Sequence, residues 1–449
     1  MKFWKDKVFL KSMIAIALPI AIQNLITSSL NMVDTLMITS LGEASIAAVG
    51  LANQVFFFYA LINFGIHSGS SIFIAQYWGR EDIPSIRKVL GLAISLSVIA
   101  GVVFTIVAFF FPEFLMGILI KDAEVISLGA DYLKVVSLSY IITGIGFAYA
   151  IALRSTGRPQ IPMIVSGISF ITNTVFNYLL IFGKFGFPEL GVKGAALGTL
   201  IARIVEIGFI LYIIYSNNGP LAASFKELTD WTKDFVNRYI TTIAPVIINE
   251  AFWSLGQIMY SIAYARIGKE ATAAVQLTTT IQNIFFVLVR GMANACAVMV
   301  GNKIGAGDRE DAIRYGNQFL IISSLIGIVF GAIMAITPDL TLKIFGDIEP
   351  GLYDMARKLL IIMGLSFFIR TFNSTAIVGV LRGGGDTQFS MFLEMGAVWV
   401  IGVPLAFIGA LWLKWPVHLV FALVLLEDIA KFAIGIPRIL SKKWIKDIT

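Results

Sequence analysis

An acidic residue stands inside a long apolar stretch near the start of the chain. Asp34 lies in "NMVDTLMI" (31–38), within an apolar segment that runs from residue 12 to residue 39. An ionised carboxylate in membrane hydrocarbon costs about 3 kcal/mol even on the mildest scale. A chain that keeps such a residue neutralises it, pairs it or uses it, so Asp34 is the first candidate for a functional role.

Amide and hydroxyl groups are expected in the same outer half of the bilayer as Asp34. Asn173 and Asn177 are four residues apart and share one face of a helix, and Thr199 lies in the following apolar segment. Carboxylate, amide and hydroxyl oxygens suit a small hard cation such as Na⁺, with Asp34, Asn173 and Asn177 as ligands. Alternatively Asp34 carries a proton, because a carboxyl group that leaves water favours its neutral form. A third interpretation is a hydrogen bond that packs two helices; we favour ion binding because intramembrane acids are functional by default.

The second half of the chain carries a different set of intramembrane charges. Glu250 lies in "PVIINEAF", and the same half holds Arg290, Arg370 and Glu394. A buried charge without a partner of opposite charge is strongly destabilising, so buried acids and arginines are expected to pair. We expect Arg290 or Arg370 to neutralise Glu250 at least partly. A direct role of Glu250 in binding a cation or a substrate stays open at this point.

Twelve apolar segments must position these residues. Hydrophobic residues make up 57% of the 449 residues and charged residues only 14%, against about 25% charged in soluble domains. About 20 helical residues cross a bilayer, and each segment reaches that length. The sequence therefore predicts an all-α integral membrane protein with spans at 12–39, 46–78, 88–111, 124–153, 159–183, 194–216, 239–265, 271–302, 311–337, 350–381, 387–413 and 417–440.

The basic residues predict how the segments are oriented. With the N-terminus inside, the inner loops and tails hold 20 Lys and Arg residues and the outer loops hold 7. Inner loops of membrane proteins carry this excess of positive charge. The chain is therefore expected to be a multi-pass protein of the cell's inner (plasma) membrane, with both termini in the cytoplasm.

The chain also repeats itself. "LGEASIAAVGL" (41–51) matches "IGKEATAAVQL" (267–277) at a numbering offset of 226, and "LRSTG" (153–157) matches "LRGGG" (381–385) at an offset of 228. Each offset crosses six spans, so the copies are parallel repeats. We expect an N-lobe over 1–216, a C-lobe over 239–449, and a cavity between two six-helix bundles where a solute moves.

The residues 217–238 form a polar join between the repeats. Phe225, Leu228, Trp231 and Phe235 recur at helical spacing, which is typical of an amphipathic helix on the inner membrane face. A solvated linker fits the composition equally well.

Several function classes find no support in the residues. Cys296 is the one cysteine, so it forms no disulfide within the chain, and the two histidines are too far apart in sequence for a metal cluster. Zinc motifs, nucleophile elbows and phosphate-binding loops are missing, so we expect neither an enzyme nor a cofactor. Three further charged sets at helical spacing are expected to be local ion pairs: Asp131 with Lys134, Arg203 with Glu206, and Glu427 and Asp428 with Lys431.

Five stretches resemble the multidrug and toxic compound extrusion (MATE) transporters, in the prokaryotic branch of that family. They are "NMVDTLMITSLGEASIAAVGLANQ", "ALRSTGRPQIP", "NYLLIFGKFGFPELGVKGAALGT", "VGNKIGAGDREDA" and "VLRGGGDT". The likeness covers nearly the whole chain, in the right order. It implies two six-helix lobes around a V-shaped cavity, alternating access, and export of cationic drugs driven by Na⁺ or H⁺.

The resemblance also assigns roles to residues. Asp34 matches the acid of the family's first helix. Asn173, Asn177 and Thr199 match its N-lobe cation site, although many members carry Asp where Asn177 stands. Glu250 matches the seventh-helix acid of several members. Their tenth-helix aspartate is missing here, with Thr371 near that place, which weakens a cation site in the C-lobe.

Two functions remain in view. The first is a cation-coupled exporter of small, mostly cationic organic compounds, working as a monomer among membrane lipids and without nucleic acid. The second is a flippase for lipids or lipid-linked oligosaccharides, whose cavity would have to be strongly cationic to hold phosphates. Arg290 and Arg370 favour that alternative to a degree, while the first half offers few unpaired cations.

Overall fold

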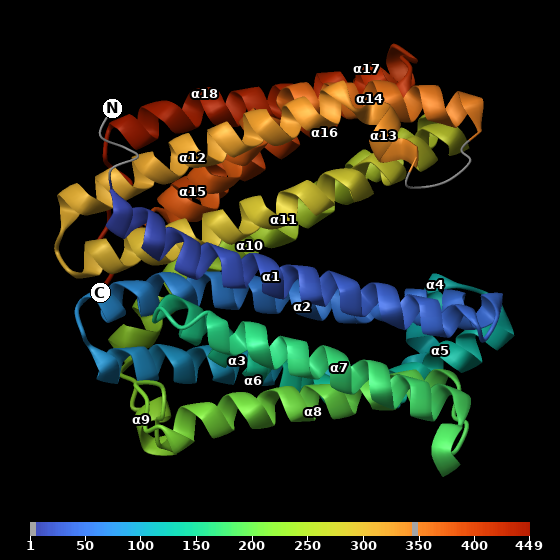
Figure 1. Ribbon diagram of the computed structural model, residues 1–449, viewed down its shortest axis with the longest axis horizontal. Coiled ribbons are helices and arrows are strands. Elements are labelled where there is room, and N and C mark those ends of the chain that lie inside the picture. The colour runs from blue at the N-terminus through green and yellow to red at the C-terminus, as the bar shows by residue number, and fades with distance from the viewer. Residues whose placement is uncertain (1–5, 344–348) are drawn as a thin grey trace. The chain divides into compact units, whose positions relative to one another are not determined.

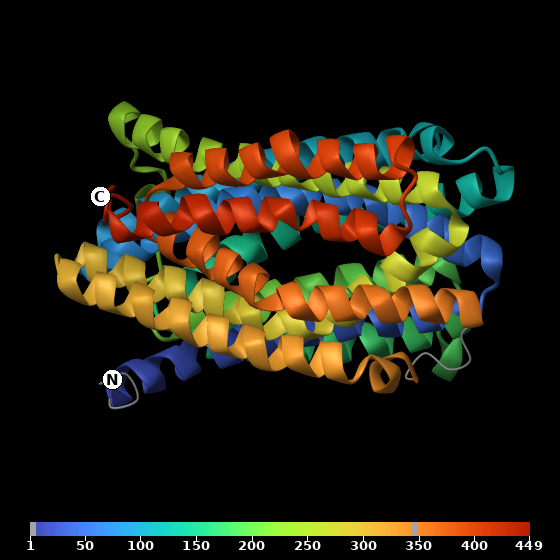
Figure 2. The same cartoon turned by 90° about the horizontal axis from the view of Figure 1, so that it is seen from above.

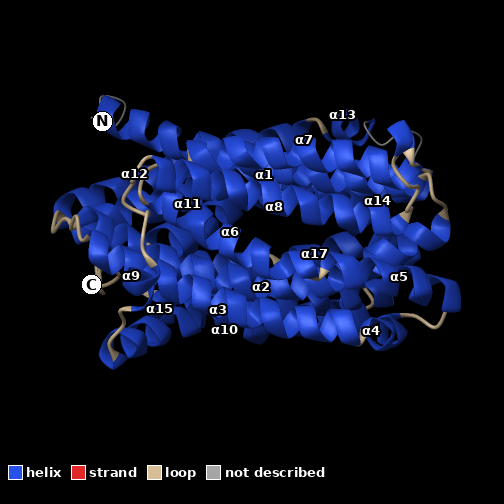
Figure 3. Ribbon diagram, turned by 90° about the horizontal axis from the view of Figure 1, so that it is seen from below, coloured by secondary structure: helices blue, strands red, loops and turns tan. Residues whose placement is uncertain are grey.

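The computed structural model describes residues 6–343 and 349–449, and in these residues helices joined by short turns make up the fold (Figure 3). No strand occurs in that part of the chain. Lys2 and Lys5, which contribute to the predicted orientation, lie outside the described residues.

Helices occupy the twelve predicted segments (Figure 1). The first half contains α1 (Lys7–Thr39), α2 (Glu43–Gly79), α3 (Ile83–Phe110), α4 (Pro112–Leu119), α5 (Ala123–Val136), α6 (Leu138–Ser155), α7 (Gln160–Phe182), η2 (Lys184–Gly186), α8 (Val192–Ser216) and α9 (Phe225–Thr229). The second half contains α10 (Lys233–Ile267), α11 (Lys269–Gly305), α12 (Arg309–Ile336), α13 (Pro338–Leu342), α14 (Pro350–Ser374), η4 (Thr375–Arg382), α15 (Thr387–Gly396), η5 (Ala397–Gly402), α16 (Val403–Phe407), η6 (Ile408–Trp412), α17 (Val417–Val424) and α18 (Leu426–Leu440).

The predicted all-α membrane fold is confirmed. Among the described residues, ten helical stretches are long and apolar enough to cross a membrane. The other two predicted spans correspond to α10 and to α17 with α18. Two kinds of detail differ from the prediction. The fourth span is interrupted at Ser137, between α5 and α6, and the twelfth at Leu425, between α17 and α18. The tenth and eleventh spans contain the π-helical stretches η4, η5 and η6.

The internal repeat extends to the helix caps. The carboxylate of Asp82 accepts a hydrogen bond from the Ser85 backbone N–H at 3.1 Å and begins α3. Asp308, its counterpart in the second repeat, accepts from the Asp311 backbone N–H at 3.1 Å and begins α12. An aspartate at this position satisfies one of the N–H groups that every helix start leaves unpaired, so the two copies start their third helices by the same device.

Two compact units make up the chain. The N-unit is Ile22–Ile243, and the C-unit is Met1–Ala21 with Ala244–Thr449. The unit borders therefore fall inside helices, since α1 and α10 each contribute to both units.

The N-unit is built around closely packed helix pairs. α7 and α8 lie side by side, and α2, α3 and α6 pack against one another. Stacked tyrosines mark its core, where the rings of Tyr59 and Tyr140 lie 5.2 Å apart at an interplanar angle of 16°. The beginning of α10 belongs to this unit, and the Tyr239 hydroxyl there lies 2.7 Å from that of Ser70 in α2.

The C-unit has an equivalent organisation. α12 and α14 run side by side (Figure 2), and α11 packs against both. The beginning of α1 belongs to this core, where the Phe9 ring lies 5.0 Å from that of Tyr315 and 5.1 Å from that of Phe319.

The join between the repeats is mostly irregular. Its one short helix is α9, and α10 begins at Lys233, so the predicted amphipathic helix does not run through the whole join. Ion pairs hold the join against α3: Arg87 contacts Glu227 at 2.5 Å and Lys88 contacts Asp230 at 2.8 Å. The Leu228 carbonyl lies so close to Gly91 of α3 that a side chain there would collide with it.

Candidate functional site

The four residues predicted to bind a cation meet in the N-unit. The Asn177 side-chain N–H group donates to Asp34 Oδ1 at 2.6 Å and to Asn173 Oδ1 at 3.1 Å. Asn173 in turn donates to the Thr199 hydroxyl at 3.3 Å. These side chains come from α1, α7 and α8, so one polar network joins three membrane-spanning helices. Asn173 and Asn177 are each 1% exposed, and Asp34 is half-buried at the edge of the network.

The close approach of α7 and α8 positions these groups. Gly198 of α8 faces the Asn177 side chain, and a Cβ atom at this position would collide with Asn177 Oδ1. Gly194, one turn earlier, faces the Leu180 carbonyl of α7 with equally little room. Small residues at a helix crossing let two backbones come close together inside a membrane. The sequence "GAALGT" thus places Thr199 within reach of α7.

One oxygen of the network has no partner. Asn177 Oδ1 is buried and makes no hydrogen bond in the described part of the chain. A buried acceptor without a donor is costly, and either a cation or a proton donor satisfies it. The oxygens gathered here are a carboxylate, two amide carbonyls and a hydroxyl. The described residues contain no group of three His, Cys, Asp or Glu side chains that could hold a metal ion. Asp34 is the one carboxylate of the network described here, and its single negative charge is balanced by one monovalent cation or one proton.

Sequence reasoning treated Arg203 and Glu206 as a local pair and missed their place beside this network. The predicted pair is present, with Arg203 Nη1 2.6 Å from Glu206 Oε2, and the Ser169 hydroxyl donates to the same carboxylate at 3.3 Å. Arg203 lies one helical turn beyond Thr199 on α8. The four-residue spacing of Thr199 and Arg203 is the signal that could have revealed it.

Glu250 has a different partner from the one predicted. Arg382, at the end of η4, donates to Glu250 Oε1 at 2.6 Å and to Glu394 Oε2 at 3.1 Å. Asn249 also donates to Glu394, at 2.6 Å. The prediction that Arg290 or Arg370 neutralises Glu250 is therefore wrong. The apolar segment ends at residue 381, so the sequence placed Arg382 in an inner loop, whereas π-helical turns continue the helix and keep its side chain only 3% exposed.

The two arginines that were expected to pair with Glu250 lie elsewhere in the C-unit. Arg370 donates to Asp428 Oδ2 at 2.9 Å and to Gln282 Oε1 at 3.0 Å. Arg290 is exposed, and its guanidinium lies 5.7 Å from the centre of the Phe286 ring. No ion pair of Arg290 occurs within residues 6–343 and 349–449.

The place in the C-unit that corresponds to Asp34 is also polar. Tyr260, the counterpart of Asp34 in the second repeat, donates a short hydrogen bond to Glu427 of α18. Glu427 is in turn the counterpart of Thr199, and Lys431, which pairs with Glu427 at 3.3 Å, is that of Arg203. The predicted pairing of Lys431 with Glu427 is present.

The remaining predicted pair has a different partner. Asp131 contacts Lys193 at 3.2 Å in place of Lys134, so that prediction is wrong. Lys193 stands at the start of α8, which packs against α5 in the N-unit.

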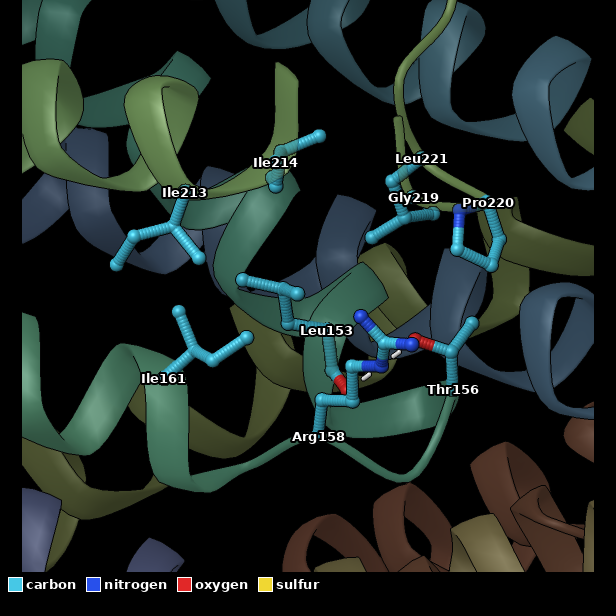
Figure 4. Close-up of a pocket in the computed structure, with 9 residues that line it drawn as sticks. All are labelled: Leu153, Thr156, Arg158, Ile161, Ile213, Ile214, Gly219, Pro220 and Leu221. Atoms are coloured by element: carbon cyan, nitrogen blue, oxygen red, sulfur yellow. Dashed lines mark hydrogen bonds between the residues drawn. The ribbon is translucent and has the colours of Figure 1, made fainter. Parts of the chain in front are cut away.

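A small pocket lies beside the turn that joins α6 to α7 in the N-unit (Figure 4). Gly219, Pro220 and Leu221 of the join cover it, above apolar side chains of α6, α7 and α8. The Arg158 backbone N–H donates to the Leu153 carbonyl at 2.8 Å in its wall. The pocket is lined mainly by apolar groups and lies apart from the polar network of Asp34.

Comparisons with known proteins find relatives that align with most of the chain. The MatE family model matches residues 19–179 and 245–408, so the two matched stretches begin at positions that correspond in the two repeats. The probable multidrug resistance protein NorM of Thermotoga maritima is 26% identical over 443 residues, which are 97% of this chain and 93% of that protein. The multidrug resistance protein PmpM of Pseudomonas aeruginosa is 24% identical over 405 residues, covering 89% and 83%.

The fold agrees with a solved structure as well. A crystal structure of MATE in complex with MaL6 matches with a TM-score of 0.87 at 21% identity, over 96% of this chain and 97% of that chain. The predicted family resemblance is thereby confirmed. The chain is a multi-pass membrane protein of the MatE (multidrug and toxic compound extrusion) family, whose members are transporters and not enzymes.

Proposed function

We propose that this transporter exports small amphipathic organic compounds, mainly cations, from the cell in exchange for Na⁺ or H⁺. Relatives named as multidrug resistance proteins support the substrate class. The proposal includes alternating access to a cavity between the two bundles, a monomer in the inner membrane, and termini on the cytoplasmic side.

The observation that carries the proposal is the network of Asp34, Asn177, Asn173 and Thr199. Ionised Asp34 accepts from the Asn177 amide N–H, while Asn177 Oδ1 is unpaired. Protonated Asp34 becomes a donor, and Na⁺ needs oxygen ligands. When the Asn177 amide turns its Oδ1 toward Asp34, this oxygen can accept a hydrogen bond from protonated Asp34 or act as a ligand of Na⁺. That turn ends the N–H bond to Asn173, so loading of the ion is transmitted along α7 and to Thr199 of α8.

Exchange then follows from a difference in affinity. An ion shifts a conformational equilibrium only as far as its affinities for the two conformations differ. In the proposed cycle the ion favours the conformation in which Asp34, Asn173 and Asn177 close around it. The exported compound favours the conformation in which Asp34 is ionised and free of the ion.

The test is dye efflux from proteoliposomes with Na⁺ and pH gradients imposed separately. Wild-type protein is expected to respond to one gradient or both, and Asp34→Asn to neither, while Asp34→Asn still inserts and folds. Asp354→Asn, which removes an exposed carboxylate that pairs with Lys358 at 2.6 Å, is the matched control and should retain efflux. Gradient-driven efflux at the wild-type rate in Asp34→Asn would refute the coupling role.

A lipid or lipid-linked oligosaccharide flippase is the second candidate function. Arg290 favours it, because an exposed arginine in an apolar helix suits an anionic headgroup. Binding of anionic lipid headgroups that is lost in Arg290→Gln, together with no gradient-driven dye efflux by the wild type, would replace the exporter proposal with this one.

A further inference from the structure

Arg154, in the last turn of α6, has no acidic partner among the residues that the structure describes. Its Nη2 group donates to Gln23 Oε1 at 2.6 Å, and Gln23 donates to the Ser166 hydroxyl at 2.9 Å. Gln23 and Ser166 are each 8% exposed. The described residues contain no ion pair of Arg154, and its Nε group is buried without an acceptor. The three side chains join α1, α6 and α7 and carry a net charge of one positive unit.

The internal repeat supplies a direct comparison in the C-unit. Arg154 corresponds to Arg382, Ser166 to Glu394 and Gln23 to Asn249. Arg382 is held by Glu394 and by Glu250, whose counterpart in the N-unit is the uncharged Asn24. The contacts of the two arginines differ, because Arg154 donates to Gln23 whereas Arg382 donates to Glu250 and Glu394. Acids surround the arginine in the C-unit, and neutral groups surround it in the N-unit.

An arginine without an acidic partner costs free energy at the depth in the membrane where Arg154 lies. Gln23 lies near the middle of the predicted span 12–39, and the guanidinium group of Arg154 reaches it. A charged group at that depth is held by a partner of opposite charge. In the C-unit the chain provides this partner, whereas in the N-unit none of the residues that the structure describes does so.

We propose that Arg154, Gln23 and Ser166 form a binding site for one small anionic group. Arg154 Nε has an unused N–H bond, and the Ser166 hydroxyl, which accepts from Gln23, keeps its own hydrogen for donation. A guanidinium N–H and a hydroxyl together suit a halide or a single carboxylate. The anion therefore has two possible sources, inorganic chloride and the carboxylate of an acidic solute.

This site is separate from the proposed cation network, so it is tested by binding and not by transport. Full-length protein in lipid nanodiscs is titrated with chloride, and the ³⁵Cl NMR line width is recorded at constant Na⁺. Wild-type protein is expected to broaden the line in a saturable manner. Addition of benzoate then separates the two sources, because it displaces chloride only where the site accepts an organic carboxylate.

Three variants give the test its specificity. Arg154→Gln is expected to lose at least nine-tenths of the saturable broadening. Ser166→Glu introduces the acid that the C-unit carries at this position. The saturable broadening should be lost in this variant as well, because the new carboxylate forms an ion pair with the guanidinium of Arg154. Arg158→Gln removes an exposed arginine four residues further on and should bind chloride like the wild type.

Two results would overturn the proposal. One is an absence of saturable broadening in the wild type together with an absence of benzoate binding when benzoate is titrated directly into the same nanodiscs and followed by calorimetry. The other is a folded Ser166→Glu variant that broadens the chloride line as much as the wild type does. This result would contradict the proposal even if Arg154→Gln did not fold.

Discussion

The ion pairs of Arg382 with Glu250 and Glu394 allow a prediction of how substitutions change the free energy of unfolding. The direction and magnitude of each change depend on how many charges are left unpaired. Arg382→Gln removes charge-assisted hydrogen bonds of 2.6 Å to Glu250 and 3.1 Å to Glu394, from a side chain that is 3% exposed. Each such bond contributes about 1.5–3 kcal/mol, and breaking a buried ion pair costs about 3–5 kcal/mol. The variant also leaves two carboxylates close together without a cation. We expect the free energy of unfolding to fall by about 3–5 kcal/mol.

Removing one acid should have a far smaller effect. Glu394→Gln keeps an oxygen that accepts from Arg382 and Asn249, and it leaves Arg382 paired one-to-one with Glu250. We expect a loss of about 1 kcal/mol or less, the range of ordinary point substitutions. The equivalent neutral contact in the N-unit provides the control: Ser166→Ala ends one uncharged hydrogen bond between helices, and such bonds contribute about 0.6 kcal/mol.

Reversible unfolding in mixed micelles of sodium dodecyl sulfate and dodecyl maltoside, followed by tryptophan fluorescence, measures all three variants. The order of destabilisation should be Arg382→Gln well above Glu394→Gln, with Ser166→Ala near the latter. If Arg382→Gln and Glu394→Gln were equally destabilising, the arginine would not be shared between two ionised acids, and the reasoning from charge count would fail.

Two further predictions concern the cation network and the join. Gly198→Ala forces Asn177 away from α8, so gradient-driven efflux should fall at least tenfold. Gly146→Ala is the control, because a Cβ there meets open space and efflux should be unchanged. Equal efflux rates in the two variants would contradict a role of the network in transport. Hydrogen bonds from Ser224 hold the pKa of Glu227 below its usual value of 4.5. The contacts that Glu227 makes in the join should therefore be complete above pH 4.5 and should be lost as the pH falls through the lowered pKa of Glu227. Their loss should appear as faster hydrogen exchange of the backbone amides in 218–232. Faster exchange already between pH 7 and pH 5 would exclude this carboxylate as the cause.

Much of the fold could be predicted from apolar length and from the repeat. The predicted spans agree with the helices to within several residues, because capping residues such as Asp82 and Asp308 stand at the ends of the apolar runs. The meeting of Asp34 with Asn177 was also predictable, since the two asparagines share one helix face and intramembrane polar groups seek each other.

The partner of Glu250 could not be predicted in the same way. Arg382 lies far along the chain from Glu250 and just past an apolar segment, where charge count alone assigns it to a loop. The π-helical turns of η4 contain extra residues, which change the direction of every later side chain. A regular helical periodicity carries no information on such turns. The repeat contained the missing signal: Arg154 and Arg382 occupy the same place in "LRSTG" and "LRGGG".

The division of α1 and α10 between the two units bears on how such a chain could have arisen from a duplicated gene. Ala17 of α1 packs on Gly291, where a Cβ would lie 2.8 Å from its carbonyl, and Ile243 of α10 packs on Gly69, where a Cβ would lie 2.6 Å from its side chain. Each repeat thus gives the first turns of its first helix to the core that the other repeat completes. A single ancestral copy of six spans would have lacked those turns in its own core. We expect two separate copies to associate by exchanging these turns, because each core is incomplete without the turns of the other copy.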